Sequence, residues 1–72
     1  MKTIVLSKVD YDVDQLITWC YRDIGSGAQF RVLGDIHKYP FYVWGYSMDF
    51  VDIIFVFKCN EDYVKFVLTW VG

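Results

Sequence analysis

The sequence predicts a small α+β fold, in which an antiparallel sheet of about four strands packs against two helices. Two segments repeat apolar residues at helical spacing, and four short runs are rich in β-branched and aromatic residues. The chain has 72 residues with no linker, repeat or charge block between these segments. Residues 1–72 are therefore expected to form a single domain in the order β-α-β-β-β-α.

The first half of the chain predicts a strand, a helix and a second strand. Thr3–Ser7 is short and rich in β-branched residues, and a polar break follows it. Asp12 is a suitable N-cap for a helix over Val13–Ile24, whose apolar residues recur at helical spacing. Two glycines in the segment 25–27 end this helix, and Gln29–Leu33 predicts the second strand.

The second half predicts two more strands and a final helix. Phe41–Tyr46 is dense in β-forming residues, and Val51–Lys58 alternates as a central strand does. Asn60 can cap a last helix that carries acidic residues in its first turn. Its C-terminal end also alternates as a strand would, so an extended end is the other reading. As a helix, with Phe66 at the margin, its apolar face comprises Tyr63, Val64, Val67, Trp70 and Val71.

Composition and charge exclude several classes of protein. The formal net charge is -2, and the seven basic residues are scattered along the chain, so no cationic stripe for nucleic acid is expected. The longest apolar run, Ile53–Phe57, is far shorter than a membrane span. The apolar run at the N-terminus stops at Leu6 without a cleavage-type tail, so we expect a cytoplasmic protein.

Neither a metal site nor a catalytic residue is predicted. Asp10, Asp12 and Asp14 begin like a calcium-binding loop, but Gln15 stands where that loop needs glycine. Cys20 and Cys59 are too far apart for a C-x-x-C motif and are expected to be reduced packing residues. We therefore expect no cofactor and no enzymatic activity.

A catalytic alternative depends on the single histidine. His37 lies in a predicted loop, and it would need Cys20 or Cys59 beside it to form a nucleophile and base pair. No feature of the sequence places either cysteine there. An abnormally low thiol pKa would favour this alternative.

The strongest functional signal is a row of aromatic residues. The period of two along a strand places three of them on one sheet face, namely Tyr42, Trp44 and Tyr46. This row can be the core beneath the helices, a protein-binding patch, or a platform on which bases stack. Trp19 falls away from the apolar stripe of the first helix and is a second candidate anchor. If the helices cover the row, the patch on the other face is Ile54 and Val56.

The end of the chain resembles a known group of small proteins. The ending Phe66-x-Leu68-Thr69-Trp70-x-Gly72 follows an acidic helix start, as in small accessory proteins of large tailed phages, although Val71 intrudes before the glycine. The resemblance is confined to residues 57–72. It implies an accessory protein that binds a host protein and redirects or blocks it.

These observations predict a non-enzymatic protein-binding module. Its expected partner is a host defence or regulatory protein that it inhibits or modulates, and self-association as a homodimer is also expected. The predicted contact residues are Tyr42, Trp44, Tyr46 and Trp19. The alternative is a single-stranded nucleic-acid-binding protein that uses the same aromatic row, which predicts strongly salt-dependent affinity.

Overall fold

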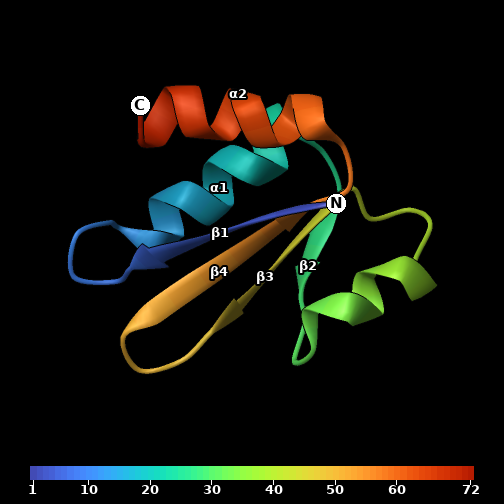
Figure 1. The fold of residues 1–72 in the computed structure, drawn as a ribbon, viewed down its shortest axis with the longest axis horizontal. Coiled ribbons are helices and arrows are strands. Elements are labelled where there is room, and N and C mark those ends of the chain that lie inside the picture. Colours follow the sequence, from blue (N-terminus) through green and yellow to red (C-terminus); the bar gives the residue numbers. More distant parts are fainter.

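Residues 1–72, described by a computed structural model, form one four-stranded sheet with two helices on one face (Figure 1). This arrangement confirms the predicted α+β class. The elements in chain order are β1 (Lys2–Ser7), α1 (Val13–Asp23), β2 (Gly27–Gln29), a short 3₁₀ helix (Leu33–Lys38), β3 (Trp44–Met48), β4 (Asp52–Phe57) and α2 (Asn60–Trp70).

The strands lie in the order β1-β4-β3-β2. β4 pairs antiparallel with β1 on one side and with β3 on the other, as its alternating apolar sequence predicts for a central strand. β2 differs from the prediction, because it pairs with β3 in parallel. The chain leaves β2, passes through the 3₁₀ helix and returns to begin β3 at the same end of the sheet (Figure 1).

The main core lies between the sheet and the helices. Ile53, Phe55 and Phe57 project from β4 toward α1 and α2 and are fully buried. Phe66 of α2 packs on two of these rings, with centroids 4.9 Å from Phe55 and 5.3 Å from Phe57. No charged residue is buried, so the free energy of folding comes mainly from removing aromatic and aliphatic surface from water.

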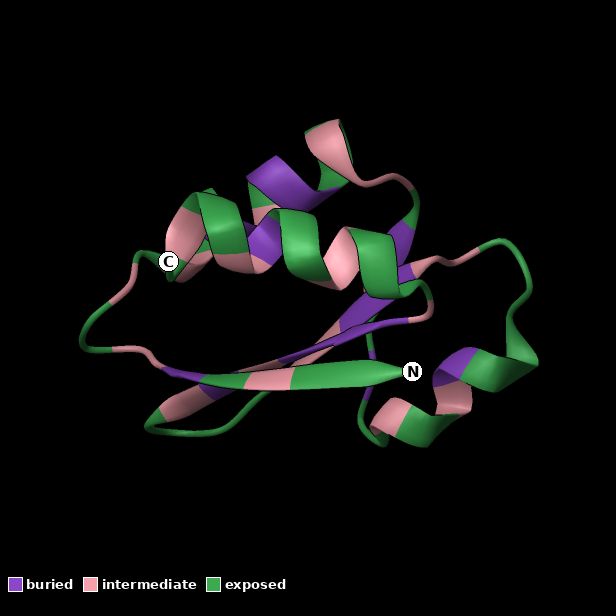
Figure 2. Cartoon of the chain, turned by 45° about the horizontal axis from the view of Figure 1, so that its top comes forward, coloured by how far each residue is buried: buried purple, intermediate pink, exposed green.

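A second, smaller cluster lies on the opposite face of the sheet. It consists of Phe30, Ile36 and Val56. The ring of Phe30 lies directly over Gly45 in β3, where a Cβ atom would come within 2.6 Å of the ring. Gly45 is therefore required for this packing. The cluster covers the sheet beside β2 and β3, whereas β1 remains largely exposed (Figure 2).

The first helix forms as predicted. The side chain of Asp12 caps it by accepting hydrogen bonds from the backbone N–H groups of Asp14 and Gln15. The chain leaves the helix at Gly25, whose φ of 142° is a conformation that L side chains rarely adopt. The carbonyl of Gly25 accepts a hydrogen bond of 2.8 Å from the indole N–H of Trp44, which ties the helix end to β3.

Two predicted strands have other boundaries. The second strand was expected over Gln29–Leu33, but the chain leaves the sheet after Gln29 because Phe30 turns onto the opposite face. The third strand was expected over Phe41–Tyr46, but it begins at Trp44. Tyr42 thus lies outside the strand, and the rule of alternation does not apply to it.

The last helix differs from its prediction in its cap and in its buried face. Cys59, rather than Asn60, is the N-cap residue, and its side chain makes no capping hydrogen bond. Phe66 is the fully buried residue of α2, because it faces the aromatic rings of β4. Val64 and Val71, expected on the buried face, are exposed. The helical reading of this segment is confirmed through Trp70.

Candidate interaction surface

The structure separates the aromatic residues that the sequence placed in one row. Trp44 has no exposed surface, and Tyr46 is half-buried beside it with the two rings stacked at 5.9 Å. Both face the helices. Tyr42 packs instead against the cluster on the opposite face, with its ring 5.9 Å from that of Phe30. Trp44 therefore offers no surface to a partner in this fold, and for this residue the core interpretation holds.

Trp19 also lies in the core. Only 8% of its surface is exposed, because α2 packs against the flank of α1 that carries it. Its ring makes edge contacts with Phe66 at 5.9 Å and with Trp70 at 6.2 Å. The apolar stripe of α1 indicates only the side that faces the sheet, so the helical periodicity of the sequence did not reveal that α2 is a second neighbour of this helix.

Exposed aromatic side chains occur elsewhere, in a segment that projects from the sheet. We call residues 31–42, which connect β2 to β3, the protruding segment (Figure 1). Phe41 is 86% exposed, and Tyr39 and Val32 are also exposed. Sequence reasoning assigned Phe41 to a strand. The signals against a strand were Pro40 before it and Gly34 and Asp35, which favour a turn.

Contacts with the body of the protein brace the protruding segment. Ile36 is fully buried against Phe30 and Val56, so the middle of the segment is anchored on the sheet. The ring of Tyr39 lies 5.8 Å from that of Phe30, and its carbonyl accepts a hydrogen bond of 2.8 Å from Lys58 Nζ. The aromatic side chains are thus presented from an ordered platform.

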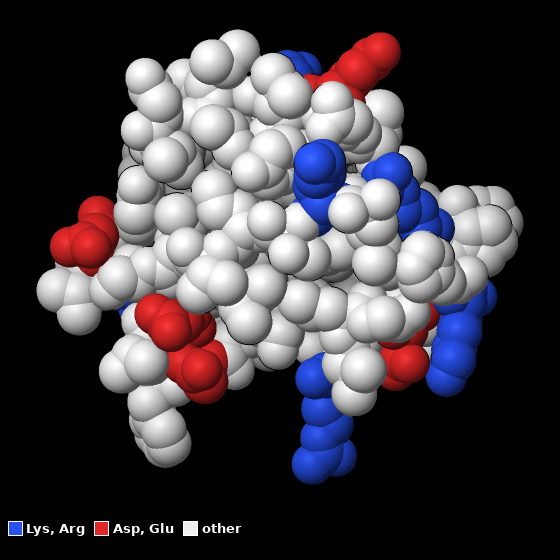
Figure 3. All heavy atoms as spheres, in the orientation of Figure 1, with Lys and Arg blue, Asp and Glu red and all other residues white.

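The protruding segment is basic within an acidic protein. Arg31 and Lys38 are exposed, and Lys58 joins them through its bond to the segment. Asp35 is the only acidic residue of the segment, and its carboxylate pairs with Lys38 at 3.3 Å. Basic groups gather on the half of the molecular face that carries this segment (Figure 3). The excess of basic residues around the protruding segment favours an acidic binding partner.

A shallow polar groove lies between the two helices. Its volume is about 560 Å³, and it is lined by residues of both helices. Two of the three charged residues that line it have partners, since Asp12 caps α1 and Arg22 pairs with Asp23 at 3.0 Å. Trp70 Nε1, a residue of this lining, is buried without a hydrogen-bond partner. Neither cysteine nor histidine is among the residues that line the groove.

The cysteines are poorly suited to catalysis or metal binding. Both are free, with Cys20 buried and Cys59 exposed. Burial, with a smaller effect from Asp23, raises the pKa of Cys20 to about 12, so this thiol stays protonated and is a weak nucleophile. No group of His, Cys, Asp and Glu side chains has the geometry to hold a metal ion.

Comparisons with known proteins found no family model, no curated protein and no solved structure that matches this chain. Neither helix has the length and apolarity that a membrane span requires.

Proposed function

We propose that this chain is a non-enzymatic protein-binding module that recognises its partner through the protruding segment. Phe41 is the central anchor, and Tyr39 lies two residues before it. Arg31 and Lys38 supply positive charge. The observation that carries the proposal is the 86% exposure of Phe41 in a segment that the body of the protein holds in place.

The energetic argument rests on this bracing. A large aromatic residue buries much surface on binding, and a preordered platform reduces the conformational entropy that binding would otherwise cost. Removal of an exposed phenyl ring hardly changes the stability of the free protein, because the ring makes few contacts there. The ring of Phe41 can therefore serve an interface without a cost to the stability of the fold.

Charge and resemblance narrow the class of partner. The basic residues around the anchors favour a protein surface that combines an apolar pocket with acidic neighbours. The resemblance of residues 57–72 to accessory proteins of large tailed phages makes a host defence or regulatory protein the partner to test first. Binding would inhibit or modulate that protein.

The test is affinity capture from a bacterial host lysate, followed by titration with the purified partner. Phe41→Ala should weaken binding by about 2 kcal/mol or more, which is roughly thirtyfold in Kd. Phe50→Ala is the matched control, because Phe50 is 99% exposed in the turn between β3 and β4. A folded Phe41→Ala protein that binds as tightly as wild type would refute the proposal.

The same residues support one second candidate, a single-stranded nucleic-acid-binding protein. Tyr39 and Phe41 are exposed aromatic rings, and Arg31, Lys38 and Lys58 lie on or against the same segment. Stacking of bases on such rings beside cations predicts an affinity that falls steeply with salt. Titration of a labelled oligonucleotide at low and high salt separates this function from an aromatic protein interface, whose affinity should change much less.

A further inference from the structure

The outer edge of β1 is unpaired. β1 pairs only with β4. The hydrogen bond of 2.8 Å from the Lys8 N–H to the Val51 carbonyl shows which residues of the N-terminal segment direct their backbone groups toward β4. In an antiparallel pair every second residue bonds to the neighbouring strand, so Leu6, Ile4 and Lys2 bond to β4 as Lys8 does. The backbone N–H and C=O groups of Thr3 and Val5 and the N–H group of Ser7 therefore point away from the sheet without a partner, whereas the Ser7 carbonyl accepts a hydrogen bond of 3.2 Å from the Asp10 N–H.

This edge lacks the features that usually prevent strand addition. It contains no proline and no glycine, and it pairs with β4 in continuous register from Lys2 to Ser7. The side chains of Thr3 and Val5 are exposed on it. Charge is confined to its two ends, at Lys2 and Lys8, and Lys8 Nζ is held by the carbonyl of Asp49 at 2.8 Å. An exposed edge of this kind is a template for another strand.

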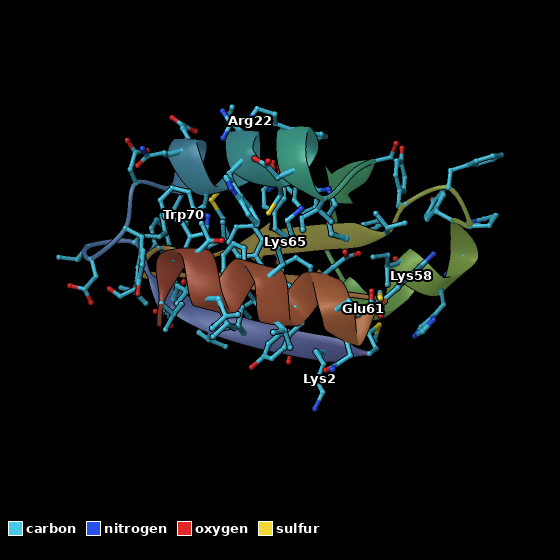
Figure 4. The ribbon with its side chains drawn as sticks, turned by 90° about the horizontal axis from the view of Figure 1, so that it is seen from above. Lys2, Arg22, Lys58, Glu61, Lys65 and Trp70 are labelled. Atoms are coloured by element: carbon cyan, nitrogen blue, oxygen red, sulfur yellow. The ribbon has the colours of Figure 1, made fainter.

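An apolar helix flank lies beside the same edge. We call it the outer flank of α2; it comprises Val64, Val67 and Val71. The side chains of Val64 and Val71 are exposed, at 41% and 46%, and Val67 is half-buried. Lys65 is on the other side of the helix, where Nζ bonds to the Asp23 carbonyl of α1 (Figure 4). The spacing of three and four residues is the one that packs against another helix.

The arrangement of β1 and α2 allows a single two-fold axis to pair each of them with its copy in a second molecule. They run side by side in the same direction, and each begins near the N-terminus of the chain (Figures 1 and 4). A two-fold axis perpendicular to β1 makes β1 antiparallel to its copy and, at the same time, makes α2 antiparallel to its copy. Since α2 packs on both β4 and β1, strand spacing of about 4.8 Å places the two helix axes about 10 Å apart, a normal packing distance.

The size of this face suits a dimer. The molecule measures 31 × 24 × 18 Å, and the view down its shortest axis faces the β1 edge and α2. A stable interface covers about 800 Å² per partner, roughly a sixth of the total surface of 4625 Å². The broadest face of the molecule has room for that area.

We infer that two copies of this chain form a symmetric dimer by antiparallel pairing of their β1 edges, with the outer flanks of α2 packed together. Val5 lies opposite Val5 of the second copy, and Thr3 lies opposite Ser7. The pairing adds about four backbone hydrogen bonds, two between the Val5 residues and two from Ser7 N–H to the Thr3 carbonyl, and joins two sheets into one of eight strands. The inference is independent of the proposed function, because the protruding segment takes no part in it.

The mass in solution tests the dimer. Sedimentation equilibrium from micromolar to millimolar chain concentration should give about twice the chain mass of 8.6 kDa. Val5→Pro removes an outward N–H and inserts a ring into the pairing edge while leaving the bonds to β4, so it should give a monomer. Val5→Thr keeps the backbone donor and the strand propensity, and it should stay dimeric.

A second variant addresses the helix contact. Val64→Glu replaces an exposed residue of the outer flank with a good helix former, so the fold should persist while the dimer dissociates. Phe50→Glu makes the same kind of change at the turn between β3 and β4 and should leave the dimer intact. Circular dichroism confirms that each variant is folded.

Cross-linking tests the register. Val5→Cys in a Cys59→Ser background should form a disulfide between copies, because residues directly opposite in a bonded antiparallel pair have Cα atoms about 5.5 Å apart. Ser47→Cys, two strands from the edge in β3, is the matched control and should form none.

Several results would overturn the inference. They are a monomer at all concentrations, a dimer that persists in folded Val5→Pro, or equal cross-linking at both cysteine positions. A wild-type monomer that forms a 1:1 complex with a different protein, lost in Val5→Pro, would assign this edge to that partner instead. Phe41→Ala should leave the dimer unchanged while it weakens partner binding, so failure of one proposal is distinguishable from failure of the other.

Discussion

Replacement of Trp44 by alanine should nearly unfold this protein, whereas replacement of Phe41 should not. Trp44 is fully buried at the centre of the helix-covered face, and it stacks on Tyr46. Its indole N–H also donates to the Gly25 carbonyl at 2.8 Å. Phe41 is 86% exposed and lies in the protruding segment.

The expected magnitude follows from burial. Truncation of a buried tryptophan to alanine costs about 3–5 kcal/mol, and the Gly25 carbonyl also loses its donor. A domain of 72 residues has a total stability of roughly 4–11 kcal/mol. The substitution therefore removes a large fraction of that stability and should lower Tm by roughly 12 °C or more. Phe41→Ala should change the free energy of unfolding by less than about 0.5 kcal/mol.

Urea unfolding followed by far-ultraviolet circular dichroism measures both variants, since this signal comes mainly from the backbone amides and so survives removal of the indole. Trp44→Phe is the intermediate variant: it keeps most of the buried volume but loses the hydrogen bond, so its midpoint should fall between wild type and Trp44→Ala. The argument fails if Trp44→Ala unfolds within about 1 kcal/mol of wild type, or if Phe41→Ala is the more destabilising change.

Two further predictions concern titratable groups. Burial raises the pKa of Cys20 to about 12, so a thiol reagent at neutral pH should modify the exposed Cys59 at once and Cys20 only as fast as the chain unfolds; rapid modification of both would contradict the burial. Backbone N–H groups of Asp52 and Val51 donate to Asp49 and hold its pKa below the ordinary 3.8. The stabilisation by ionised Asp49 is therefore complete above pH 3.8 and is lost as the pH falls further, so the difference in unfolding free energy between wild type and Asp49→Ala should shrink in acid. An equal difference at neutral pH and well below pH 3.8 would contradict this assignment.

The elements with strong local signals were predicted well. Asp12 caps α1 as expected, because a capping side chain needs only the backbone of the next turn. β4 is central and alternates as expected, with Phe55 buried beneath the helices. These features depend on residues close together in sequence. The boundary of β3 was wrong because Tyr42 packs on Phe30, a contact that strand propensity does not contain.

The candidate surface was harder to predict than the fold. Aromatic residues serve equally in a core and in an interface, so Trp44 and Phe41 look alike in the sequence. Their exposure differs because one lies in β3 under the helices and the other lies in a segment beyond the sheet. The wheel likewise gave Trp19 no buried neighbour, since the position of α2 against α1 is a tertiary property.

By itself, the sequence determined the α+β class, the capped first helix, the central β4 and the absence of a long apolar span. Periodicity and capping are local, and they mark which residues share a face. Only the tertiary structure decided which face the helices cover, because that choice depends on contacts between distant segments. It placed Trp44 in the core, exposed Phe41, and left the edge of β1 beside an apolar flank of α2.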